Sequence, residues 1–233
     1  MTIPFLKFRY LKFETEQGWR ILHARNQKEL DNLIKKFKPL NVYHSLALFH
    51  EPLKAEKSSY KYHRKPFRCE FVLDFDSLEQ EQIINGYKLM KKFGYGKPQR
   101  IVFTGGGFHL IFDIPNMDNR LAKAISNKLK RYGLKWDYMV SIDPENRVVR
   151  MQNTFNSNKG LYSKLLYNNT NAGEQLTAKM LKAMTAFNRP TNNIVRRRAN
   201  QLKLPDSYAH HFITTMFKKR FVIYKKFYTK HSA

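Results

Sequence analysis

Residues 70–76 (Glu-Phe-Val-Leu-Asp-Phe-Asp) have the composition and spacing of a metal-binding strand. In a β-strand, alternation places the apolar side chains on one face and Glu70, Asp74 and Asp76 on the other. Neighbouring carboxylates repel each other unless a cation lies between them, and Mg²⁺ or Mn²⁺ is a natural candidate in a basic chain. The segment therefore predicts a divalent-metal site, with a solvated strand end or a helix-capping aspartate as the alternative.

A run of three glycines leads into a second apolar strand at residues 104–112. Backbone amides in such a turn can approach an anion closely, which makes Gly106 and Gly107 candidate nucleotide-binding residues. His109 alternates with apolar neighbours, so it faces the same side as the aspartates and can donate a hydrogen bond to a phosphate oxygen. An ordinary hairpin turn beside a solvated histidine is the alternative.

A third segment contains Asp143 and is followed by the basic residues Arg150 and Lys159. These two cations could bind triphosphate or template phosphates, or simply form a solvated basic edge. In the usual split βαβ sheet the first and third strands are neighbours and the fourth flanks the first. That order predicts that four side chains converge on one open sheet face: Asp74, Asp76, His109 and Asp143.

The elements that must position these residues belong to an α+β fold. Residues 1–66 predict an N-terminal αβ unit, with strands near 5–13 and 42–49 and a helix between them. That helix has four apolar residues on one face: Leu30, Leu33, Ile34 and Phe37. Residues 54–65 predict an exposed basic connection.

Residues 67–165 predict a β-α-β-β-α-β unit like the RNA-recognition motif. The expected strands are 69–76, 100–104 and 108–114, with further strands between 138 and 151, and the expected helices are 77–93 and 118–132. A capping box at residues 77–80 predicts the start of the first helix. Residues 1–165 would form one core, and residues 166–233 a basic helical C-terminal region.

Composition indicates a polyanionic partner. The 43 basic and 18 acidic residues give a formal net charge of +25, which favours nucleic acid over a membrane surface. The sequence has no membrane-length apolar stretch and no secretory leader, so we expect an intracellular, cytoplasmic protein acting at the nucleoid or replication sites. Cys69 is the single cysteine, so we expect no thiolate zinc site and interpret Cys69 as structural.

Taken in order, the three segments resemble the catalytic motifs of the archaeo-eukaryotic primase superfamily, which includes the primase small subunit and primase-polymerases. The match spans about residues 68–162: Asp74-x-Asp76, the glycine turn into Phe-His109-Leu, and Asp143 before the Arg150–Lys159 segment. The resemblance implies that Asp74, Asp76 and Asp143 are catalytic metal ligands and that His109 contacts the nucleotide phosphates.

The same resemblance implies a DNA primase or primase-polymerase in replication or repair. Such an enzyme performs template-dependent nucleotidyl transfer with two Mg²⁺ or Mn²⁺ ions, an NTP or dNTP and a single-stranded DNA template, with a helicase or second primase subunit as partner. The chain lacks the cysteine/histidine zinc site of cellular relatives, and Gln152 and Asn156 replace a proline and a histidine frequent in the family. Both departures favour a compact, divergent member.

The C-terminal arginine run, Arg196, Arg197 and Arg198, is a candidate template-binding segment, with a solvated helix face or partner dock as the alternative. Two other functions stay open. One is a non-enzymatic single-stranded nucleic-acid-binding module, against which the acidic rather than aromatic sheet face argues. The other is an inactive primase-like replication scaffold.

Overall fold

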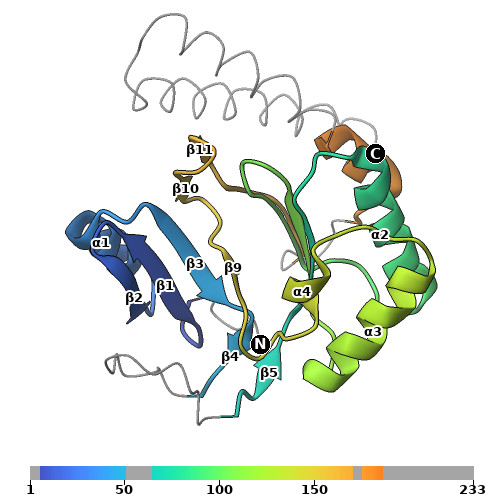
Figure 1. The fold of residues 1–233 in the computed structure, drawn as a ribbon, viewed down its shortest axis with the longest axis horizontal. Helices are drawn as coiled ribbons and strands as arrows, with labels where there is room; N and C mark the ends of the chain where they lie inside the picture. Colours follow the sequence, from blue (N-terminus) through green and yellow to red (C-terminus); the bar gives the residue numbers. More distant parts are fainter. Residues whose placement is uncertain (1–5, 51–64, 170–174, 186–233) are drawn as a thin grey trace, which may run out of the picture.

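The computed structural model describes residues 6–50, 65–169 and 175–185 (Figure 1). Within these ranges the chain forms two antiparallel sheets of six and four strands, with a short two-stranded ladder between β4 (Ala47–Leu48) and β5 (Arg68–Cys69). The predicted α+β class is confirmed at this level. None of the helices in these ranges has the length and apolar character needed to cross a bilayer.

The six-stranded sheet combines N-terminal strands with three strands from much later in the chain. Its members are β1 (Tyr10–Thr15), β2 (Gly18–His23), β3 (Asn41–Ser45), β9 (Val148–Arg150), β10 (Phe155–Asn156) and β11 (Leu161–Tyr162). Helix α1 (Gln27–Phe37) packs its predicted apolar face against Leu11 and Phe13 of β1. The Asn26 side chain caps α1 by accepting a hydrogen bond from the Glu29 backbone N–H.

The four-stranded sheet has the order β12-β7-β8-β6. Its strands are β6 (Phe71–Phe75), β7 (Arg100–Phe103), β8 (Phe108–Phe112) and β12 (Lys164–Asn168). Helices α2 (Gln80–Lys92) and α3 (Asn119–Arg131) cover one face of this sheet (Figure 1). Alternation on β6, β7 and β8 sends large side chains into that helix-covered core, among them Phe71, Leu73, Phe75, Phe103, Phe108, Leu110 and Phe112.

The predicted fourth strand of this sheet is wrong. Residues 138–141 form a short helix, α4 (Tyr138–Ser141), and β9 pairs with β3 of the other sheet. The α4 segment lies along the free edge of β6, where the Asp137 N–H donates to the Asp74 carbonyl (2.7 Å) and Ser141 Oγ donates to the Val72 carbonyl (2.6 Å). Edge carbonyls that a strand would have satisfied are therefore bonded by a helix.

Three smaller predictions also differ from the structure. The strand expected near 5–13 is β1 at 10–15, and it forms a hairpin with β2, which was not expected. Helix α2 begins at Gln80 without a side-chain cap instead of at a Ser77 capping box. Strand β12 runs to Asn168, and helix follows at 178–185, so the C-terminal region begins with a strand. Residues 54–64 of the expected basic connection lie outside the described ranges.

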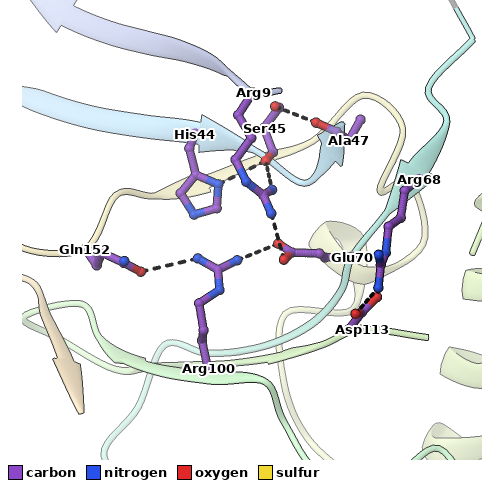
Figure 2. Close-up of polar contacts among 9 residues, drawn as sticks. All are labelled: Arg9, His44, Ser45, Ala47, Arg68, Glu70, Arg100, Asp113 and Gln152. Carbon is purple, nitrogen blue, oxygen red and sulfur yellow. Dashed lines mark hydrogen bonds and ion pairs between the residues drawn. The ribbon is translucent and has the colours of Figure 1, made fainter. Parts of the chain in front are cut away.

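A buried ion network joins the two sheets (Figure 2). Glu70, which is 4% exposed, binds Arg9 Nη2 through Oε1 (2.7 Å) and Arg100 Nη2 through Oε2 (2.5 Å). Arg9 Nη1 also donates to the Ser45 carbonyl of β3 (2.7 Å), and Arg100 Nη1 donates to Gln152 Oε1 (3.3 Å). Glu70 therefore belongs to the interior and not to the acidic surface suggested by its spacing.

Apolar side chains complete the contact between the sheets. Leu46, which follows β3, and Val149 of β9 pack against Val72, Val102 and Ile111 of the four-stranded sheet. Each of these five residues is at most 2% exposed. The sheets thus form one continuous body around a shared interior.

We expect Glu70→Gln to lower the free energy of unfolding by about 3–5 kcal/mol, because it removes the negative charge that two buried guanidiniums share. Denaturant unfolding measures the loss. Glu29→Gln is the control, since Glu29 pairs with Arg25 at the solvent-exposed end of α1 and its loss should barely move the midpoint. Equal midpoints for Glu70→Gln and wild type would contradict the structural role of the network.

Candidate active site

A cavity of about 450 Å³ lies between the two sheets, next to the ends of β6 and β7. This volume is in the range of small-ligand sites. Its lining combines acidic, basic and glycine residues with a few apolar ones: Tyr43, Asp74, Asp76, Thr104, Gly106, Gly107, His109, Val140, Val148, Val149, Arg150, Asn156, Asn158 and Lys159.

Asp74 and His109 form the inner part of the acidic wall. They are directly paired across β6 and β8, so both side chains leave the sheet on the cavity side. His109 Nε2 lies 3.2 Å from Asp74 Oδ1, and the histidine is 4% exposed. Its other ring nitrogen, Nδ1, is buried and has no hydrogen-bond partner among the described residues.

Asp76 lies at the solvent-accessible end of the same strand face. Partial desolvation raises the pKa of its carboxyl, and the negative charges of Asp74 and Asp137 raise that pKa further. Lys159 and His109 act in the opposite direction, but the net shift is upward. The neighbouring positive charges of the protein therefore do not offset the factors that disfavour the ionised form of Asp76.

The glycine turn fits closely over the end of β6. A Cβ on Gly107 would lie 1.7 Å from the Phe75 carbonyl oxygen and 3.0 Å from Asp76 Cα, so no side chain can be accommodated there. The turn is closed by the Thr104 N–H donating to the Gly107 carbonyl (3.0 Å). Gly106 differs, because its hypothetical Cβ meets only the flexible Lys159 side chain, with Cε at 2.8 Å.

The opposite wall is basic and belongs to the six-stranded sheet. Arg150 donates through Nη1 to Asn41 Oδ1 (2.8 Å) and through Nη2 to the Tyr43 hydroxyl (3.2 Å), which fixes its guanidinium. Burial lowers the pKa of Arg150, although an arginine remains charged at neutral pH. Asn156 ties this wall to the other sheet, since its Nδ2 donates to the Thr104 carbonyl (2.7 Å).

Seven of the sequence-predicted residues line this one cavity: Asp74, Asp76, Gly106, Gly107, His109, Arg150 and Lys159. Asp143 is not among the lining residues. It occupies a turn instead, where its carbonyl accepts from the Arg147 N–H (3.1 Å) and its Oδ1 accepts from Asn146 Nδ2 (2.9 Å). Arg196, Arg197 and Arg198 lie outside the described residues.

Asp137, which the sequence analysis did not single out, lies next to the acidic wall, although like Asp143 it is not among the lining residues. Its N–H is bonded to the Asp74 carbonyl, and its charge contributes to the raised pKa of Asp76. The Asp137 side chain also caps α4 by accepting from the Met139 N–H (3.0 Å). No local pattern marks it, because its position depends on α4 replacing a strand at the edge of β6.

The carboxylates of the cavity meet some of the requirements for binding a hard divalent cation such as Mg²⁺. Across the described ranges, no three His, Cys, Asp or Glu side chains are grouped so that they could hold a metal ion. Mg²⁺, however, commonly binds one or two carboxylates and completes its shell with water and substrate phosphates. The Asp74–Asp76 pair, with the raised pKa of Asp76, fits that kind of site.

We expect Gly107→Ala to damage the cavity, because the added methyl group collides with backbone atoms of Phe75. The matched control is Gly106→Ala, whose methyl group displaces only the mobile end of Lys159. Thermal unfolding of both variants tests this, with a clearly lower midpoint expected for Gly107→Ala alone. Equal midpoints for the two variants would count against the tight turn.

The raised pKa of Asp76 predicts a pH-dependent effect of Asp76→Asn. A carboxyl whose pKa is higher in the folded state costs stability as the pH rises through that pKa. Asp76→Asn should therefore stabilise the protein at about pH 7, and the gain should vanish at about pH 3, where the carboxyl is protonated in the unfolded state as well. Urea unfolding at both pH values measures this, with the exposed α1 substitution Asp31→Asn as control.

Comparisons with known proteins connect the chain to polymerase folds at low similarity. No protein-family model and no curated protein matches the sequence. The chain is similar to the AEP domain of the primase-polymerase of cyanophage S-2L, with 11% identity and a TM-score of 0.47 over 76% of this chain and 88% of that one. It is also similar to the catalytic domain of the primase RepB′ in complex with initiator DNA (12%, TM-score 0.44, 78% and 86%). A third similar structure is the polymerase domain of Mycobacterium tuberculosis ligase D in complex with DNA (14%, TM-score 0.45, 80% and 73%). The chemistry of the chain must therefore be argued from its own residues.

Proposed function

We propose that this chain is a template-dependent nucleotidyltransferase of the primase-polymerase type. The observation that carries the proposal is the cavity in which two carboxylates on one wall face Arg150 and Lys159 on the other. A nucleoside triphosphate bound with divalent metal presents both signs of charge and matches both walls. The chain's net charge of +25 also favours a nucleic-acid template.

Each wall has a distinct task in this proposal. Asp74 and Asp76 would hold the metals. Arg150, oriented by Asn41 and Tyr43, would bind phosphate oxygens together with Lys159, and the His109 ring beside Asp74 would contact the phosphates. Bound Mg²⁺ or Mn²⁺ would lower the pKa of the attacking 3′-hydroxyl and stabilise the pyrophosphate leaving group. The preformed turn at Gly107 keeps the acidic strand end at a fixed distance from the phosphates.

The third carboxylate is proposed to be Asp137 and not Asp143. Asp137 is bonded through its backbone to Asp74 and influences the ionisation of Asp76, whereas Asp143 is engaged in a turn with Asn146. Asp137 would need to release the Met139 N–H to reach a metal. The metal-bound state supplies the attraction for that change.

The decisive experiment is incorporation of labelled nucleotide on a defined single-stranded DNA template, with and without a primer, in Mg²⁺ or Mn²⁺. We expect products complementary to the template, and loss of more than about a hundredfold in rate for Asp74→Asn and Asp76→Asn. DNA affinity should persist in both variants, since removing a negative charge does not weaken attraction to phosphates.

Two further variants separate the candidates for the third ligand. Asp137→Asn should lose most of the activity and Asp143→Asn should retain it, and the reverse result would favour the assignment made from the sequence. Template binding without any nucleotide incorporation would instead favour a non-enzymatic binding module or an inactive scaffold.

A further inference from the structure

A row of alternating cationic and aromatic side chains crosses the six-stranded sheet on the face opposite α1. Lys12 Nζ lies 4.1 Å from the Trp19 ring centroid, the Trp19 and Tyr43 centroids are 5.8 Å apart at 54°, and the Arg150 guanidinium lies 4.9 Å from the Tyr43 centroid. The strand register places Lys12 directly beside Tyr43, so these side chains share one face.

Packing of the interior does not account for Trp19. Its side chain is 48% exposed, and it belongs to none of the three buried clusters found within the described ranges. It is nevertheless held on a regular hairpin. Strands β1 and β2 pair without a break, from Tyr10 opposite His23 to Thr15 opposite Gly18. A large aromatic side chain on a rigid, solvent-facing strand is typical of a stacking surface.

The row begins inside the cavity and ends outside it. Tyr43 and Arg150 line the cavity, whereas Trp19 and Lys12 lie beyond its lining. A mononucleotide bound at the acidic wall would end within the cavity, but a strand that passes through it would continue over Trp19. The cations at both ends of the row suit the phosphates of such a strand.

We propose that Trp19, with Lys12 and Tyr43, forms a platform on which bases of the single-stranded DNA template stack beside the active site. The inference rests on the proposed function, which identifies the bound strand as the DNA template. A base takes up the indole face, and the Lys12 ammonium transfers from the ring to a neighbouring phosphate.

The test uses the full chain without metal or nucleotide, so that binding is measured apart from catalysis. An unstructured single-stranded oligonucleotide should quench tryptophan fluorescence, and Trp19→Phe should abolish that quenching while keeping affinity within about threefold, since phenylalanine still stacks. Trp19→Ala should weaken binding, measured by anisotropy of a labelled strand, by about fivefold or more. Tyr132→Ala is the matched control, because Tyr132 is an equally exposed aromatic (52%) at the end of α3.

The outcomes separate this inference from the proposed function. Unchanged affinity of Trp19→Ala, or equal weakening by Tyr132→Ala, would overturn the platform even if the enzyme is active. Quenching by a nucleoside triphosphate alone, equal to that by the strand, would also overturn it, because Trp19 would then serve the nucleotide. Trp19-dependent strand binding by a chain that makes no product would support the platform and contradict the enzymatic proposal.

Discussion

The fold depends on one buried carboxylate that serves two guanidiniums. Glu70 lies just before β6, Arg100 begins β7, and Arg9 precedes β1, so the network fixes the starting points of three strands from both sheets. Strands β6 and β7 then run in the same direction from this network toward the cavity. At about 3.3 Å per residue, the four residues from Glu70 to Asp74 span roughly 13 Å. The spacing of the walls at Asp74 and Arg150 thus depends on this distant ion network, on the apolar layer that includes Val149 next to Arg150, and on the Asn156–Thr104 hydrogen bond.

The network also concentrates positive charge next to the cavity wall. Two arginines share one glutamate, and burial lowers the pKa of Arg100 to about 10, which still keeps it protonated at neutral pH. Arg150 and Lys159 add two more cations at the cavity itself. This side of the molecule therefore attracts anions, whereas Asp74 and Asp76 need a cation. A ligand that carries both signs, such as a metal-bound polyphosphate, satisfies the two requirements together, and a simple anion or a free metal satisfies only one.

Sequence reasoning succeeded where the determining interactions are local. Strand alternation correctly placed Asp74, Asp76 and His109 on one side of β6 and β8, because the period of two residues is a property of each strand. It failed for the strand expected around Asp143, since the preceding residues form α4 and β9 joins β3, which is a choice between distant pairing partners. Asp137 and Tyr43 escaped notice for the same reason. Their roles arise from contacts with Asp74 and Arg150, and nothing in the neighbouring sequence encodes those contacts.

The carboxylates of residues 70–76 show how one spacing gives different outcomes. Glu70, Asp74 and Asp76 follow the same alternation, but the protein gives them different partners. Glu70 has two arginines, Asp74 has one histidine nitrogen at 3.2 Å, and Asp76 has a raised pKa because desolvation and neighbouring acids outweigh Lys159. A carboxylate that the protein neutralises is fixed and structural, whereas one left under-compensated favours any cation that can reach it. Since compensation decreases toward the open end of β6, a cation that enters the cavity would meet its strongest attraction at Asp76.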